Sequence, residues 1–128
     1  MPRPMILACQ LSEARLAKLR FLCMKAGVLL KAVPEADFAQ PVGALCGLME
    51  RNEAPEAGEA FDGEMIVFCH MDHMMVNRFL QLQKQQRVPM FAIKAMLTPT
   101  NAGWNIYGLY AELKQEREAI INGDQPNH

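Results

Sequence analysis

The residues best suited to hold a ligand form one compact polar group within an otherwise apolar stretch. The group consists of Lys94, Thr98, Thr100 and Asn101. Hydroxyl and amide donors at the start of a helix, with an ammonium group nearby, are what an anion such as phosphate or carboxylate requires. The same residues also suit a turn, because Pro99 sets its own φ angle, threonine hydroxyls bond neighbouring backbone and Trp104 fills the core. The pattern favours the turn and leaves an anion site as the competing interpretation.

A second set of reactive side chains follows the apolar run 65–69. Cys69 and His70 have the atoms needed for a metal site or an activated thiol, with Asp72 and His73 close by. No distant pair of ligands completes a known metal-binding spacing, so no metal is expected. Asp72 also suits the N-cap of a helix. Cys69 and His70 remain candidate ligand-binding residues, against the alternative of a buried thiol beside a loop histidine.

Composition excludes several classes of protein. The chain has 128 residues, of which 51% are hydrophobic, and its formal net charge is −1. This balance argues against a nucleic-acid partner, which usually requires a basic face. No apolar run is long enough to span a bilayer, so no membrane partner is expected. Neither GxGxxG nor GxxxxGKS/T occurs, and we expect no cofactor.

The four cysteines indicate a reducing compartment. They are Cys9, Cys23, Cys46 and Cys69. None forms a CxxC pair, so neither a zinc knuckle nor a redox dithiol of that type is predicted. Two of them end apolar runs, where a buried thiol is common. Reduced thiols predict a cytoplasmic protein.

An internal repeat with an offset of 60 residues organises the chain. Residues 5–28 align with residues 65–88, and five positions of this alignment are identical. The pair Ser12 and Asp72 supplies a preferred N-cap residue in each copy. We therefore expect a single domain over residues 1–128, with repeats 5–50 and 65–121 joined by the acidic linker 51–64.

Each repeat is predicted to form a strand, a helix, a second strand and a second helix. The strands are expected at 5–9, 28–33, 65–69 and 90–97, and the helices at 12–27, 41–50, 72–86 and from Asn105 to Asn122-Gly123. The acid-rich segment 50–64 contains a proline and two glycines, which is typical of a solvated, mobile linker.

Alternating strands and helices predict an α/β fold with three layers and a parallel sheet in the order 2-1-3-4. A ferredoxin-like α+β sheet is the alternative, because the long linker lets the third strand enter in the opposite direction. In the parallel arrangement a crevice opens between the first and third strands. Its rim would carry Cys9-Gln10 and Cys69-His70, with the loop 98–101 on the same edge of the sheet.

The last part of the chain resembles a known family. An apolar strand with Lys-Ala is followed by Leu-Thr-Pro-x-Asn, a tryptophan and a Leu-rich acidic helix. The matching residues are Lys94, Ala95, Leu97, Thr98, Pro99, Asn101, Trp104, Leu109, Glu112 and Leu113. This pattern resembles a domain of unknown function, DUF3783, over residues 65–121. The resemblance implies an uncharacterised bacterial, cytoplasmic protein and no particular activity. Asn105 stands where the family usually has Thr or Ser, and keeps the cap.

Three functions are compatible with these features. The first is a non-catalytic binding or regulatory module for a small anionic ligand or a protein partner, acting through the edge that bears Lys94 and Asn101. The second is an enzyme with a low-pKa thiol at Cys69, assisted by His70. The third is a homo-oligomeric structural module, suggested by surplus apolar residues at 29–33 and 73–82. We favour the binding module.

Overall fold

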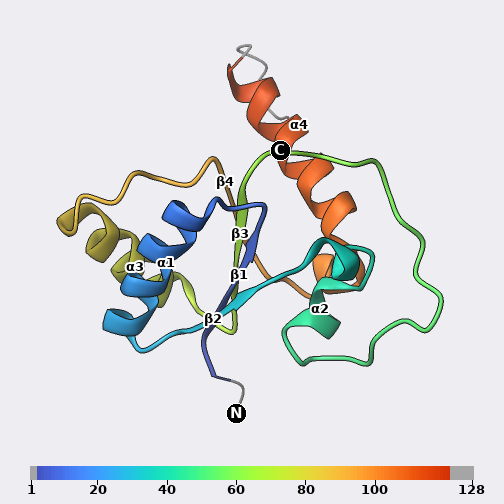
Figure 1. Cartoon of the computed structure of the whole chain (residues 1–128), viewed down its shortest axis with the longest axis horizontal. Coiled ribbons are helices and arrows are strands. Elements are labelled where there is room, and N and C mark those ends of the chain that lie inside the picture. The colour runs from blue at the N-terminus through green and yellow to red at the C-terminus, as the bar shows by residue number, and fades with distance from the viewer. Residues whose placement is uncertain (1–2, 122–128) are drawn as a thin grey trace.

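The computed structural model describes residues 3–121 and contains one four-stranded sheet (Figure 1). The strands are β1 (Met5–Cys9), β2 (Leu29–Ala32), β3 (Met65–Cys69) and β4 (Ile93–Met96). They lie in the order β2-β1-β3-β4. The predicted α/β class and strand order are therefore confirmed.

The direction of the strands differs from the all-parallel expectation. β1 and β2 are parallel, as are β3 and β4, but β1 and β3 run antiparallel. The sheet is therefore mixed. Parallel neighbours need a crossover on one face of the sheet, whereas the long segment 46–64 leaves the chain free to start β3 beside the C-terminal end of β1. Cys9 consequently pairs with Met65 at one end of these two strands, and Met5 pairs with Cys69 at the other end.

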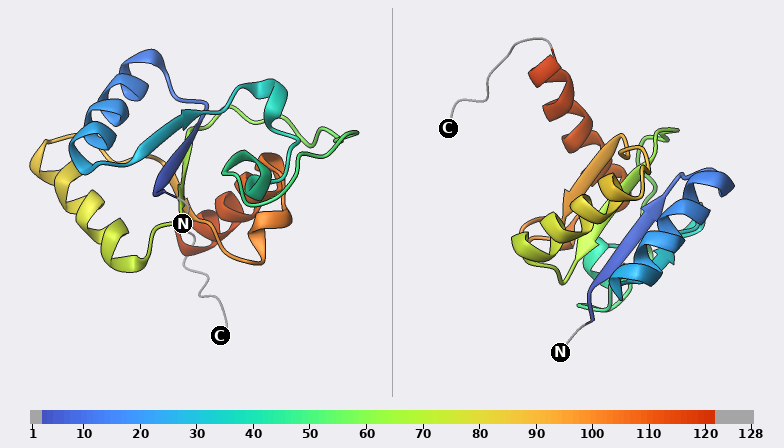
Figure 2. Two further views of the ribbon diagram at one scale, coloured as in Figure 1. Left: turned by 90° about the horizontal axis from the view of Figure 1, so that it is seen from below. Right: turned by 90° about the vertical axis from the view of Figure 1, so that its left-hand side faces the viewer.

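Helices cover both faces of the sheet and make three layers (Figure 2). The first face is covered by α1 (Glu13–Ala26) and α3 (His73–Gln85). The second is covered by η1 (Glu35–Asp37), α2 (Val42–Leu45), η2 (Asn101–Gly103) and α4 (Ile106–Ile121). Side chains alternate along each central strand, so Ile6 and Ile66 pack towards α1 and α3 while Leu7 packs towards α2 and α4. Burial on both faces explains why β1 and β3 are apolar throughout.

Residues 60 apart take the same backbone roles in α1 and α3. The Ser12 side chain accepts a hydrogen bond from the Arg15 N–H at 3.2 Å, and the Asp72 side chain accepts one from the Met75 N–H at 2.8 Å. Both predicted N-caps are thus confirmed. The second strands follow a different offset, because Leu29 pairs with Met5 but Ile93 pairs with Met65. Residues 89–92 are the extra segment that shifts β4.

The C-terminal ends of α1 and α3 provide a test of this equivalence. Gly27 has φ 70° and Arg87 has φ 56°, so both lie in the left-handed region. Gly27→Ala is expected to lower the free energy of unfolding by about 1 kcal/mol, since a Cβ disfavours that conformation. Arg87→Gly is expected to raise it by about 0.5 kcal/mol for the same reason. Urea unfolding of both variants measures the effect, and a change of equal sign in the two would contradict the equivalence.

The helices on the second face differ in length. α2 is a single turn ending at Leu45 rather than the predicted helix to residue 50. In α4 the Asn105 side chain accepts the Gly108 N–H at 2.9 Å, which confirms the predicted cap. Trp104 is 39% exposed, so the expectation that it fills the core is wrong. The expected end of the last helix at Asn122-Gly123 lies outside the described residues.

The acidic segment 50–64 is exposed along most of its length but attached at both ends. Asn52 exchanges two hydrogen bonds with the buried Gln40 side chain, at 2.7 and 3.0 Å. Phe61 stacks on Tyr110 with ring centroids 3.9 Å apart, and also on Phe38 at 5.5 Å. These contacts attach one end of the segment beside α2 and the other end to α4. In residues 3–121 the structure has no helix with the length and apolarity needed to cross a membrane.

Candidate functional site

The polar group 98–101 forms a self-contained turn. The Asn101 side chain accepts the Thr98 N–H at 2.8 Å and donates to the Met96 carbonyl at 2.9 Å. The Asn101 N–H in turn donates to the Thr98 hydroxyl at 3.0 Å. Asn101 is buried, whereas Thr100 is exposed. Because the amide already bonds the backbone on both sides, this geometry supports the turn interpretation.

Lys94 does not join that turn. It lies on the edge strand β4, is exposed, and pairs with Ile66. Ile66 packs on the face covered by α1 and α3, and strand alternation places the Lys94 side chain on that face. Asn101 belongs to η2, which contacts α2 on the opposite face. The structure therefore separates the predicted ammonium group from the predicted amide.

The crevice predicted from the sequence between β1 and β3 is not formed. The two strands are antiparallel, so Cys9-Gln10 and Cys69-His70 lie at opposite ends of the strands. The rule that places ligands at the carboxyl ends of neighbouring strands applies only where those strands are parallel. β3 and β4 are parallel, and the loop 98–101, which follows β4, therefore lies at the same end of the strands as His70, which follows β3.

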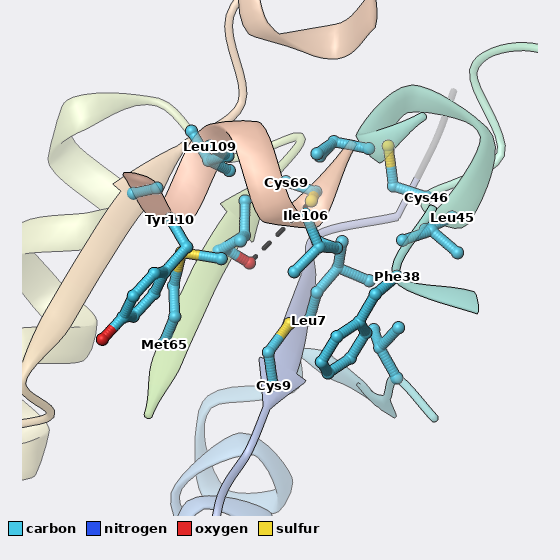
Figure 3. Close-up of a cluster of buried hydrophobic side chains, with 14 of the residues drawn as sticks. Leu7, Cys9, Phe38, Leu45, Cys46, Met65, Cys69, Ile106, Leu109 and Tyr110 are labelled. Atoms are coloured by element: carbon cyan, nitrogen blue, oxygen red, sulfur yellow. Dashed lines mark hydrogen bonds between the residues drawn. The ribbon is translucent and has the colours of Figure 1, made fainter. Parts of the chain in front are cut away.

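Cys69 instead lies in the same buried cluster as Cys46, a residue that the sequence did not single out (Figure 3). Cys69 is the last residue of β3, and Cys46 follows the single turn of α2. The Cys46 Sγ lies 3.5 Å from the Gly43 carbonyl oxygen, and His70 Nε2 lies 3.0 Å from the Cys46 carbonyl oxygen. Cys46 and Cys69 are 23 residues apart in the sequence, so no local spacing reveals that they share this cluster.

The two thiols differ in their tendency to ionise. A hydrogen bond with Cys69 and the nearby His70 lower the pKa of Cys46 to about 6, against the opposing effect of burial. The hydrogen bond with Cys46 and burial both raise the pKa of Cys69. Cys69 is also fully buried. The activated thiol expected at Cys69 is therefore not supported, and Cys46 is the sulfur that loses its proton first.

Charge is strongly segregated between the two helical layers. Residues 12–28 and 72–88, which contain α1 and α3, carry seven basic and two acidic side chains. The basic ones are Arg15, Lys18, Arg20, Lys25, Arg78, Lys84 and Arg87. Residues 34–63 and 98–119, which include the helices of the opposite side, carry ten acidic and three basic side chains, and Glu64 pairs with Arg15 of α1. A net charge of −1 thus conceals a basic layer and an acidic one.

The basic layer also carries a groove and exposed methionines. A groove of about 730 Å³ runs along α3 and the turn after it. Its lining includes Asn77, Leu80, Lys84, Arg87, Val88 and Met90. Met24, Met74 and Met90 are more than half exposed. We call this surface of α1, α3 and residues 86–90 the basic face. Sequence reasoning missed it because it used the net charge of the whole chain rather than the charge of each helix.

The described residues define a small three-layer α/β protein built on a mixed four-stranded sheet. Between residues 3 and 121, no group of three or more His, Cys, Asp or Glu side chains is placed to hold a metal ion. Residues 64–120, from the start of β3 into α4, match the family model described as Domain of unknown function (DUF3783). The resemblance noted from the sequence is therefore confirmed for this segment of the chain. Neither the curated proteins nor the solved structures gave a match to the chain.

Proposed function

We propose that the protein is a non-catalytic binding module whose basic face receives an acidic, partly apolar segment of a protein partner. The observation that carries this proposal is the groove along α3, whose surface is mainly apolar, with the amides of Asn77 and Gln81 in its lining, and which is bordered by Lys84 and Arg87. Both cations are exposed. A segment with carboxylates at the rim and apolar side chains on the groove floor complements this surface.

The chemistry of the basic face favours a protein over a small anion or a nucleic acid. Methionine side chains are flexible and suit surfaces that adapt to peptides. The groove lining combines Leu80, Val88 and Met90 with only two cations, whereas a nucleic-acid site needs an extended row of phosphate contacts. The turn at Thr98 and Asn101 offers less to a small anion, because its polar groups bond one another.

Charge reversal in the groove tests the proposal. A fluorescent peptide of alternating glutamate and leucine is expected to bind the full chain at low salt, as measured by anisotropy. The double variant Lys84→Glu/Arg87→Glu is expected to weaken binding about tenfold or more, since two favourable charge pairs become repulsive. Added salt should weaken binding to the original chain as well.

Lys114→Glu is the matched control, because Lys114 is exposed on α4, away from the basic face. It should leave the affinity for the peptide unchanged. Equal losses in the control and the double variant would contradict the groove as the site. Tighter binding of single-stranded DNA than of the peptide would overturn the choice of a protein partner, and self-association through the groove would replace it with a second copy of the chain.

We also propose that the chain is one domain that arose by duplication, with copies 5–50 and 65–121 joined by 51–64. Support comes from the N-caps Ser12 and Asp72 and from the left-handed Gly27 and Arg87, each pair 60 residues apart. Relatives whose halves resemble each other more closely than these halves do are the expected finding. Loss of the 60-residue match in every relative would count against a duplication.

A cytoplasmic location is part of the proposal. All four cysteines are unpaired thiols, as a reducing compartment maintains them. Rapid acid quenching of cells followed by alkylation should find four reduced thiols, and a constitutive disulfide would contradict this location.

A further inference from the structure

The exposed sulfur of the described residues lies in methionines rather than in cysteines. All four cysteines are buried. By contrast, Met24 is 73% exposed, Met74 is 63% exposed and Met90 is 51% exposed. All three of these methionines lie on the basic face. A thioether loses no proton before it reacts with an oxidant, so access to the sulfur decides which methionines react first.

Met90 differs from the other two because it also lines the groove along α3. It shares that lining with the cations Lys84 and Arg87. Met24 and Met74 lie on the same face but do not line the groove. A change in the polarity of Met90 therefore alters the groove itself, whereas the same change in Met24 or Met74 alters only its surroundings.

The backbone at Met90 is restrained by hydrogen bonds. The Met90 carbonyl accepts from Arg15 Nη2 at 3.0 Å. The preceding Pro89 carbonyl accepts from Arg15 Nη1 at 3.0 Å and from Gln83 Nε2 at 2.9 Å. Because two neighbouring carbonyls are held in this way, the side chain at position 90 is attached to a fixed point beside the groove, and it stays there when its sulfur is oxidised.

The geometry points to Met90 as a site of reversible oxidation to the sulfoxide by hydrogen peroxide or an organic hydroperoxide, which weakens binding in the groove. The effect on binding rests on the proposed function, whereas the assignment of the modified residue does not. The thioether gives the groove an apolar, flexible wall. A sulfoxide is polar, and its oxygen accepts hydrogen bonds. It therefore removes apolar contact and competes with a partner's carboxylates for Lys84 and Arg87.

The chemistry balances in both directions. The Met90 sulfur attacks one peroxide oxygen with a lone pair, an S–O bond forms and the O–O bond breaks. The leaving hydroxide or alkoxide takes up the proton of the transferred oxygen and becomes water or an alcohol. The sulfur is oxidised by two electrons and the peroxide is reduced by two. A methionine sulfoxide reductase reverses the step with a dithiol: the S–O bond breaks, the oxygen leaves as water and the dithiol becomes a disulfide.

Peptide mapping of the full chain tests where the modification occurs. The folded protein is treated with hydrogen peroxide at neutral pH for increasing times, digested and analysed by mass spectrometry. Sulfoxide should form at Met90 about tenfold or more faster than at Met65, because the buried Met65 reacts only after local opening of the structure. The two types of methionine sulfoxide reductase, one for each epimer, should restore Met90 in the folded chain. Oxidation of Met90 no faster than that of Met65 would overturn the assignment.

Binding of the fluorescent peptide of alternating glutamate and leucine tests the effect of the modification. Oxidation is expected to weaken binding about three- to tenfold, in step with the fraction of Met90 converted. Met90→Leu keeps an apolar side chain that peroxide does not oxidise, so its affinity should be the same before and after treatment. This variant retains all four cysteines, and a loss of affinity in it as large as in the original chain would overturn the inference.

Two matched controls separate Met90 from its neighbours on the basic face. Met24→Leu and Met74→Leu should still lose affinity on oxidation, because both variants retain Met90. An oxidised chain that binds the peptide as tightly as the untreated chain would overturn the effect on binding. If the untreated chain does not bind the peptide at all, the proposed function fails together with that effect, whereas the map of sulfoxides still decides whether Met90 is the modified residue.

Discussion

An Asn101→Ala variant is expected to lose about 3 kcal/mol of its free energy of unfolding. The Asn101 side chain is buried and bonds the Thr98 N–H and the Met96 carbonyl. Alanine removes both bonds and leaves two backbone groups without a partner, and each costs about 1–3 kcal/mol when shielded from water. Urea unfolding followed by circular dichroism measures the loss.

Two neighbouring substitutions make this result specific. Thr100→Ala should change stability by less than about 0.5 kcal/mol, because Thr100 is exposed. The loss of stability in Asn101→Asp should lie between those of Thr100→Ala and Asn101→Ala, since a carboxylate still accepts from the Thr98 N–H but cannot donate to the Met96 carbonyl. If Asn101 instead served a bound anion, Asn101→Ala would melt normally and would lose only a stabilisation by added phosphate. That outcome would restore the anion-site interpretation.

The sheet order was predictable from the sequence because the alignment of residues 5–28 with residues 65–88 constrains both halves together. Two β-α-β units place their first strands at the centre, where apolar runs such as 5–9 and 65–69 are buried on both faces. The caps Ser12, Asp72 and Asn105 followed from local residue preferences alone. These features depend on short-range chemistry, which a sequence displays directly.

The direction of β3 was not predictable on the same grounds. A strand that is apolar throughout buries the same side chains in either direction, and the linker 50–64 reaches either edge of the sheet. The sequence therefore did not determine which residues lie at the same end of β1 and β3, and the predicted crevice depended on that arrangement. Trp104 illustrates a related limit. Its size suggested a core position, but its backbone carbonyl accepts the Val42 N–H beside the Pro41–Asn105 bridge, and the indole is partly exposed.

The candidate sites were predictable only in part. Charges can be counted for each helix, so the basic face was accessible from the sequence once α1 and α3 were known to share one layer. Cys46 was not accessible, because it joins the buried cluster that contains Cys69 only when α2 folds over the sheet. Contacts between residues far apart in a chain leave no local pattern, whereas turns such as 98–101 are encoded in adjacent residues.

Arg15→Leu is the second substitution with a large expected effect, again about 3 kcal/mol. Arg15 joins α1 to two other segments, at Glu64 and at residues 89–90, through one guanidinium group. Its Nε and Nη2 donate to the Glu64 carboxylate at 3.3 and 3.0 Å. Its Nη1 and Nη2 also donate to the Pro89 and Met90 carbonyls, both at 3.0 Å. Hydrogen bonds to charged groups contribute about 1.5–3 kcal/mol each where they are shielded.

Arg15→Lys separates charge from geometry. A lysine keeps the positive charge but cannot make the forked contact with Glu64, nor hold two carbonyls at the same time. It also loses most of the stacking on the Phe91 ring, whose centroid lies 4.2 Å from the guanidinium carbon. Arg15→Lys should therefore recover less than half of the stability lost in Arg15→Leu. Full recovery by lysine would show that charge alone matters at this position.

The pH dependence of stability identifies the role of Glu64. Partial burial raises the pKa of Glu64, but hydrogen bonds from Arg15 and from the Ala92 N–H, with the Arg15 charge, outweigh it and leave the pKa below 4.5. A carboxyl whose pKa is lowered by folding stabilises the protein above its unfolded pKa, and this stabilisation is lost as the pH falls through the folded value. Thermal melts between pH 6 and pH 2 should therefore show that the melting temperature falls below about pH 4.5.

This fall in melting temperature should be smaller in Glu64→Gln, and smaller again in Arg15→Leu if the two residues act as one pair. Equal acid sensitivity in all three chains would mean that other carboxylates cause the loss, and that Arg15 stabilises the fold mainly through the carbonyls of residues 89 and 90.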